Sequence, residues 1–189
     1  MDKMIVVGNE NYDEFIKEDG YYVDKTELVH ELVAKTRNKV TLFTRPRRFG
    51  KSLTMSMLES FFDIRRDSAD VFRGRKIMEN HPDFCKEWMN RYPVLFLSLK
   101  DVEGLDFESA CAMLGNRISG KCAELAYLAE DVRITERDRK AFERLQSEQG
   151  SISDIKSSLD TMMRMMKAVY GKPVILLIDE YDVAESDPP

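Results

Sequence analysis

The sequence has few cysteines and histidines, the residues that form disulfides and most zinc sites. It contains three cysteines and two histidines in 189 residues. Cys85, Cys111 and Cys122 form no Cys-x-x-Cys pair, and two of them lie in a segment with helical periodicity. We therefore expect buried, reduced thiols in place of a zinc site or a disulfide framework.

Long apolar runs are also missing. No segment has the roughly 18 consecutive apolar residues of a membrane-spanning helix. The first residues, MDKMIVVGNENYDEF, have too short an apolar stretch and the wrong flanks for a secretory signal. With 43% hydrophobic and 33% charged residues, the composition is that of an ordinary globular domain. The expectation is one cytoplasmic domain that has no contact with a membrane.

An excess of positive charge is absent as well. The net charge of -5 argues against a surface that coats nucleic acid, so such a partner is not indicated. Positive charge is concentrated in one short segment instead, at Arg45, Arg47, Arg48 and Lys51. A local cluster of this kind suits a phosphate group.

Strand-like and helix-like patterns alternate along the chain, which is typical of a parallel sheet with helices on its faces. Strands are predicted at 39–44, 92–99 and 174–179, and helices at 23–36, 52–62, 107–129, 134–150 and 152–170. Asp24 and Glu27 are spaced as a capping box for the first of these helices. The methionines from Met162 to Met166 fit a core-facing helix better than an adaptable partner surface. The fold class is therefore α/β.

Residues 44–58, TRPRRFGKSLTMSML, join a predicted strand to a predicted helix. Phosphate groups bind at such turns, because backbone N–H groups and the positive end of the helix dipole face the anion. Gly50 allows close backbone approach, Lys51 would reach the β- and γ-phosphates, and Ser52 would ligate Mg²⁺. Arg45 stands where the usual loop has its first glycine. The loop alone leaves a nucleotide site and a basic turn both open.

The segment VILLIDEYD supplies a second part of the same machinery. Asp179 follows an apolar strand, and the carboxyl end of a parallel strand faces the crevice where α/β sheets bind ligands. Asp179 can hold Mg²⁺ opposite Ser52, and Glu180 can orient the attacking water. The alternative is a solvated acidic strand end. Both parts in the expected order favour the nucleotide site.

Four segments, YYVDKTELV, TRPRRFGKSLTMSMLESFF, YPVLFLSLK and VILLIDEYD, resemble the AAA-ATPase-like domain of a widespread bacterial and archaeal family. That family often carries a PD-(D/E)XK nuclease-like domain further along its chain, and Arg45 in place of glycine matches its form of the loop. The resemblance implies a three-layer P-loop NTPase fold over 1–189, truncated after the Walker B strand, with ATP and Mg²⁺ as cofactors. A nuclease-like domain in a longer parent and a homo-oligomer are further expectations.

The resemblance also implies roles for residues. Lys51 and Glu180 would be catalytic, and Ser52 and Asp179 would hold the metal. By analogy with other P-loop ATPases, the nucleotide would contact the loop and a segment ahead of it: Arg45, Pro46, Arg47, Arg48, Phe49, Gly50, Lys51, Ser52, Leu53, Tyr22 and Asp24. For Tyr21 and Tyr22, stacking on adenine competes with core packing. Phe49 suits an anchor of the loop, and at least one of Arg47 and Arg48 suits solvent or a partner.

Three functions are compatible with these residues. The first is Mg²⁺-dependent ATP hydrolysis, the second a nucleotide-binding switch with little turnover, and the third a small-molecule phosphotransferase. Glu180 directly after Asp179 favours water as the acceptor over a second substrate. In P-loop ATPases whose catalytic Glu directly follows the metal Asp, the sheet usually has an additional strand between the loop strand and the Asp strand, and that strand comes later in the sequence. The resemblance therefore implies that strands 39–44 and 174–179 are separated by a gap or mispaired here. This chain would then bind nucleotide weakly, whereas a longer parent would bind and hydrolyse it.

Overall fold

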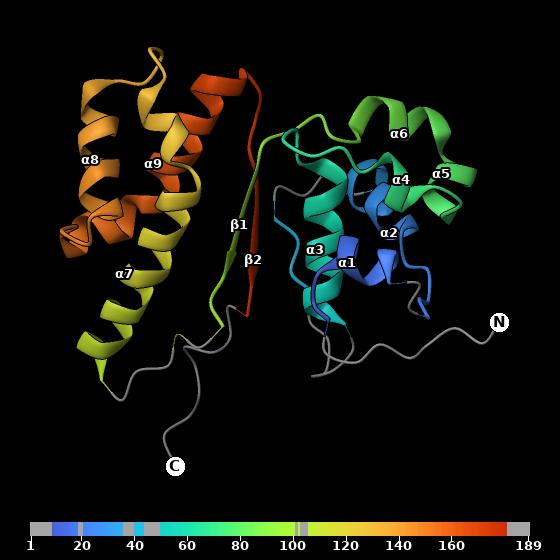
Figure 1. Cartoon of the computed structure of the whole chain (residues 1–189), viewed down its shortest axis with the longest axis horizontal. Helices are drawn as coiled ribbons and strands as arrows, with labels where there is room; N and C mark the ends of the chain where they lie inside the picture. Colours follow the sequence, from blue (N-terminus) through green and yellow to red (C-terminus); the bar gives the residue numbers. More distant parts are fainter. Residues whose placement is uncertain are drawn as a thin grey trace. The chain divides into compact units, whose positions relative to one another are not determined.

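The computed structural model describes residues 9–18, 21–35, 40–43, 50–100, 102 and 106–180. The chain is a mixed helix and strand protein that divides into two compact units, Met1–Val94 and Leu95–Pro189 (Figure 1). None of the described helices is long and apolar enough to cross a membrane. Each unit is built around its own set of buried side chains.

The first unit is helical in its described part. Its elements are α1 (Tyr12–Lys17), α2 (Glu27–His30), the π-helical turn η1 (Glu31–Lys35), α3 (Lys51–Phe62), α4 (Ala69–Phe72), α5 (Lys76–Asn80) and α6 (Pro82–Trp88). Helix α3 is the longest of these, and α1 packs against it. Its apolar side chains Met55, Met57, Leu58, Phe61 and Phe62 are buried.

Aromatic side chains fill the interior around α3. Phe61 meets Phe72 of α4 edge to face, with ring centroids 5.3 Å apart, and stacks on Phe84 of α6 at 5.9 Å. Trp88 stacks on Tyr92, the first residue of the strand predicted at 92–99, with ring centroids 4.9 Å apart. Such pairs add to the free energy of burial, so the helices around α3 are fixed against it.

The second unit combines a small parallel sheet with helices. Strands β1 (Val94–Ser98) and β2 (Ile175–Asp179) pair with each other, which confirms the strands predicted at 92–99 and 174–179. Helices α7 (Phe107–Glu124), α8 (Glu136–Gln146) and α9 (Ile152–Tyr170) pack against one another, and the 3₁₀ turn η2 (Ala126–Glu130) links α7 to α8. One residue of β1, Leu95, joins the core that these helices form.

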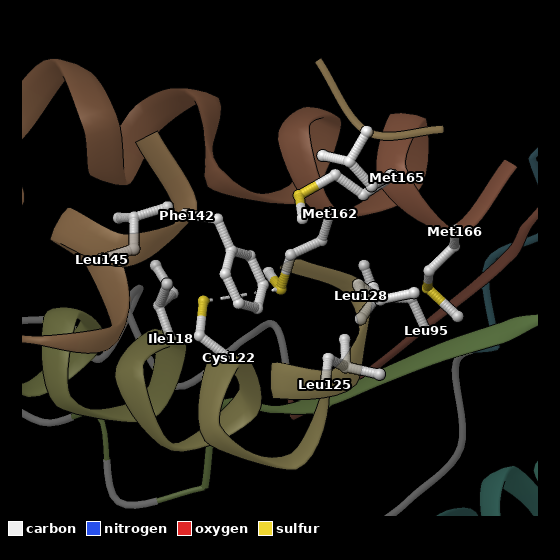
Figure 2. Close-up of a cluster of buried hydrophobic side chains, with 11 residues drawn as sticks. Leu95, Ile118, Cys122, Leu125, Leu128, Phe142, Leu145, Met162, Met165 and Met166 are labelled. Atoms are coloured by element: carbon white, nitrogen blue, oxygen red, sulfur yellow. Dashed lines mark hydrogen bonds between the residues drawn. The ribbon is translucent and has the colours of Figure 1, made fainter. Parts of the chain in front are cut away.

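Figure 2 shows this core of the second unit. Its buried members are Leu95, Ile118, Cys122, Leu125, Leu128, Ile134, Phe142, Leu145, Met162, Met165 and Met166. The burial of Met162, Met165 and Met166 confirms the core-facing interpretation of the methionine stripe. Cys122 lies with its sulfur 4.0 Å from that of Met162, and burial raises the pKa of its thiol to about 12. Cys85 and Cys122 are buried free thiols, as expected.

Local signals set the ends of α9. Ser151 accepts a hydrogen bond from the Asp154 amide, and the Asp154 side chain accepts one from the Ser151 amide, so the two form a capping box. Gly171 ends the helix with a left-handed backbone, φ +66°. A side chain would strain this conformation, which explains why a glycine stops the helix there.

Several predictions about the elements are wrong, and the helix expected from residue 23 begins only at Glu27 and continues as the π-helical turn η1. Residues 40–43 form no strand, and Val40 is 82% exposed; residues 39 and 44 lie outside the described part. A strand needs a pairing partner, and within the described residues β1 and β2 pair with each other. The predicted capping box of Asp24 and Glu27 does not form. Thr26 is the N-cap of α2, and the Asp24 carboxylate accepts hydrogen bonds from the amides of Thr26 and Lys76 instead. Helix 107–129 ends already at Glu124, and helix 134–150 is shortened to α8.

We predict that Phe142→Ala lowers the free energy of unfolding by about 3–5 kcal/mol, because the ring is fully buried between α7 and α9 and its removal leaves a cavity. Urea denaturation followed by circular dichroism measures the change. Glu143→Ala, at an exposed position of the same helix, is the control and should stay within about 0.5 kcal/mol of the parent. Equal losses in both variants would show that the core of Figure 2 is wrongly assigned.

Candidate functional site

Gly50 sets the geometry at the start of α3. It is the N-cap of that helix and has a left-handed backbone, φ +72° and ψ +35°. Its carbonyl oxygen accepts hydrogen bonds from the Thr54 amide at 3.0 Å and from the Thr54 hydroxyl at 2.8 Å. A glycine adopts this conformation without strain, so the chain can turn sharply into α3.

Lys51 and Ser52 are the first two residues of α3, and both are half-buried. Gly50 has no side chain to cap the helix, and no acidic residue lies in its first turn. The amide groups and the dipole at such a helix start favour an anion. Leu53, also half-buried, follows directly, whereas Arg45, Pro46, Arg47, Arg48 and Phe49 lie outside the described residues.

Tyr22 packs inside the first unit. Its ring meets Tyr12 edge to face, with centroids 5.5 Å apart, and the Arg75 guanidinium lies 5.5 Å from the ring centroid. Its hydroxyl donates to the Met57 sulfur of α3 at 3.3 Å, and burial raises the pKa of Tyr22 to about 12. These contacts support the core-packing interpretation of Tyr22, whereas Tyr21 is 62% exposed. Contact of Tyr22 with a nucleotide base stays a prediction.

Asp24 organises the segment between Tyr22 and α2. Its carboxylate accepts hydrogen bonds from the Thr26 amide at 2.9 Å, the Thr26 hydroxyl at 2.7 Å and the Lys76 amide at 3.0 Å. Burial raises the pKa of Asp24, but the hydrogen bonds from Lys76 and Thr26 outweigh it and hold the pKa below its ordinary value. The carboxylate thus ties its segment to α5, and a direct role of Asp24 toward the nucleotide stays a prediction.

Lys25 is a residue that the sequence interpretation missed. A Cβ placed on Gly50 would lie 3.8 Å from the Lys25 ammonium nitrogen. This lysine therefore reaches the start of α3 from a position 25 residues earlier in the chain. The segment YYVDKTELV was noted for its aromatic residues, and no local pattern showed that its lysine would meet Gly50.

Asp179 and Glu180 lie in the second unit, at the end of β2. Asp179 is 3% exposed, its carbonyl oxygen accepts from the Leu99 amide at 3.0 Å, and its carboxylate accepts from the Glu180 amide at 3.0 Å. Glu180 has a left-handed backbone, φ +55°, which is uncommon for a residue with a side chain. Strain of this kind is frequent at functional sites.

The predicted residues therefore fall on two units. Lys51 and Ser52 belong to the first, and Asp179 and Glu180 belong to the second. Within the described residues, no group of three or more histidine, cysteine, aspartate or glutamate side chains is placed to hold a metal ion. The predicted magnesium site uses the Ser52 hydroxyl and a single carboxylate, that of Asp179, so it does not require such a group of three. The site stays a prediction.

Comparison with protein families identifies the class of this chain. The sequence model of the family described as predicted AAA-ATPase, or AAA-ATPase-like, matches residues 6–186. The match includes both units, with the start of α3 and the end of β2. The chain therefore belongs to the AAA-ATPase-like family.

One curated protein shares sequence with most of the chain. It is an uncharacterized protein in the vnfD 5′ region of Azotobacter chroococcum mcd 1, 28% identical over 168 residues. The alignment covers 87% of this chain and 26% of that protein. This chain therefore spans about a quarter of the length of the relative. No solved structure matches the chain.

The backbone at Gly50 gives a test of the site's geometry. Gly50→Ala should lower the free energy of unfolding by about 1–2 kcal/mol, because alanine is strained at φ +72°. Gly120→Ala is the matched control: it lies within α7, and a Cβ there meets no atom within 4 Å. It should raise the free energy of unfolding by about 0.5–1 kcal/mol. The same sign for both variants in thermal or urea unfolding would rule out the left-handed start of α3.

Proposed function

We propose that the chain is a nucleotide-binding domain that holds the phosphate groups of ATP at the start of α3. One observation carries the proposal: a left-handed Gly50 leads directly into Lys51 and Ser52 at the first turn of a largely buried helix. This is the conformation in which a backbone approaches phosphate closely. Membership of the AAA-ATPase-like family supports the same function.

In this proposal each residue has a chemical task. Lys51 binds the β- and γ-phosphates, where its charge offsets the negative charge that develops during transfer. Magnesium would supply further charge neutralisation, held by the Ser52 hydroxyl and the Asp179 carboxylate. Burial of Asp179 and its hydrogen bond from the Glu180 amide fix the carboxylate in one orientation. Hydroxyl and carboxylate oxygens are ligands of the kind that Mg²⁺ prefers.

Glu180 would orient the attacking water. The water oxygen forms the new bond to the γ-phosphorus, the bond from that phosphorus to the bridging oxygen breaks, and the water proton passes to the Glu180 carboxylate. Glu180 follows the last residue of β2 directly and has a left-handed backbone. A strained position that carries a carboxylate suits this role better than a solvated strand end.

The finer features predicted from the sequence belong to the same proposal. They are a three-layer P-loop sheet, nucleotide contacts from the loop 45–49, from Leu53 and from the segment with Tyr22 and Asp24, and a cytoplasmic location. Because the chain spans about a quarter of its curated relative, hydrolysis, a nuclease-like domain and a homo-oligomer are proposals for the full-length protein. Little turnover with intact binding would make the domain a nucleotide switch.

We predict that Lys51→Ala weakens ATP binding by about a hundredfold, because it removes a charged hydrogen-bond donor to the phosphates, an interaction of about 1.5–3 kcal/mol. Isothermal titration calorimetry with Mg-ATP measures the affinity. Lys17→Ala, which removes the same charge from an exposed position of α1, should bind as the parent does. Unchanged affinity in Lys51→Ala would refute the assignment of the site.

A second prediction separates hydrolysis from binding. Glu180→Gln should retain ATP affinity and lower the hydrolysis rate by about 10²-fold or more, because the amide keeps the shape but accepts no proton. Phosphate release by the full-length protein measures the rate. Glu148→Gln is the matched control, since Glu148 is exposed and has a similar left-handed backbone, φ +59°. Equal rates for Glu180→Gln and the parent would give Glu180 a structural role.

A further inference from the structure

Two lysines meet the start of α3. Lys51 is the first residue of the helix, and Lys25 comes from the segment ahead of α2, with its ammonium nitrogen 3.8 Å from the position of a Cβ on Gly50. Lys25 is half-buried, so part of its aliphatic chain is covered by the protein. The arrangement places a second cation where the proposed nucleotide site has its phosphate groups.

The backbone that carries Lys25 is held from one side by α5. Thr26 is fully buried, and its hydroxyl donates to Asp24 while it accepts from the Ile77 amide at 3.2 Å. Asp24 also accepts from the Lys76 amide. The residues on each side of Lys25 are therefore fixed by long-range hydrogen bonds to α5, which leaves little freedom for the backbone of Lys25 itself.

Helix α3 holds the same segment from the other side. The Lys25 amide donates to the Tyr22 hydroxyl at 3.4 Å, and that hydroxyl donates to the Met57 sulfur at 3.3 Å. Met57 is fully buried within α3, so Tyr22 links the backbone of Lys25 to the helix that begins at Gly50. The backbone of Lys25 and Gly50 are therefore both connected to α3. This connection fixes the position of the Lys25 backbone relative to Gly50.

The electrostatics of this arrangement favour an anion. The start of a helix carries partial positive charge, which disfavours a nearby cation and favours a nearby anion. Lys25 and Lys51 both add positive charge at this end of α3, and the first turn contains no acidic residue. A phosphate group placed there interacts favourably with all three sources of positive charge.

We propose that Lys25 is a second phosphate-binding residue of this site, whose ammonium group contacts the phosphate chain of the nucleotide beside Lys51. This inference rests on the proposed function. Asp24, Thr26 and Tyr22 are then positioning residues, because they act on the ligand through Lys25. The roles suggested for Asp24 and Tyr22 thereby change from direct nucleotide contacts to support of a neighbouring lysine.

The test compares Lys25→Met, which removes the charge and keeps most of the aliphatic length, with Lys51→Ala and the control Lys17→Ala. Calorimetry measures binding of Mg-ATP and of inorganic triphosphate, and urea unfolding measures stability. We expect Lys25→Met to weaken binding of both ligands by about tenfold, with unfolding unchanged and Lys17→Ala unaffected. Lys25→Arg, which keeps the charge, should recover most of the affinity for inorganic triphosphate.

The outcomes separate this inference from the proposed function. If Lys51→Ala weakens binding and Lys25→Met does not, Lys25 has no ligand role and the site itself stands. Lower stability of Lys25→Met with unchanged affinity would make it a structural residue and overturn the inference. If the parent binds neither ligand, or Lys51→Ala binds as the parent does, the proposed function fails and the inference fails with it.

Discussion

The burial of α3 fixes the start of the candidate site. Met57, Leu58, Phe61 and Phe62 lie within an aromatic interior, so the helix cannot rotate or slide without opening the core of the first unit. The first turn of α3, with Lys51 and Ser52, is thereby held in place within the first unit, and Gly50 leads into it with a left-handed backbone. Preorganisation of this kind lowers the entropic cost of binding an anion. The chemistry proposed for the first turn therefore depends on apolar packing further along the helix.

A second constraint is the polar anchoring of residues 22–26. The Asp24 carboxylate and the Thr26 hydroxyl have partners in α5, and the Tyr22 hydroxyl has a partner in α3. Buried polar groups are costly unless they are hydrogen-bonded, so a network in which these groups have partners specifies one arrangement of the segment. The consequence is that a lysine far from the loop in sequence arrives at Gly50. In the second unit, Asp179 is likewise held by backbone contacts to Leu99 and Glu180.

Local signals in the sequence were sufficient for several elements. The spacing of the methionines from Met162 to Met166 predicted α9, and in the structure Ser151 and Gly171 set its ends, because each of these signals acts within a few residues. The apolar runs at 92–99 and 174–179 are also local signals, and they predicted β1 and β2. Residues 40–43 have a strand-like pattern, but pairing depends on a partner distant in sequence, and the pattern does not contain that information. Asp24 was assigned to a helix cap from its local spacing to Glu27. Its hydrogen bond from the Lys76 amide crosses 52 residues, so local spacing could not predict it. The proximity of Lys25 to Gly50 is tertiary in the same way, so the site's second cation was missed.

The start of α3, with Gly50, Lys51 and Ser52, is the proposed phosphate-binding part of the nucleotide site. Solution NMR of the chain with Mn-ATP tests it directly, because paramagnetic Mn²⁺ broadens the amide signals nearest to it. We predict that the signals of Lys51 and Ser52 are both lost on addition of Mn-ATP, while that of Phe142, in the core of the second unit, persists. Unchanged signals of Lys51 and Ser52 would contradict the nucleotide site at the start of α3.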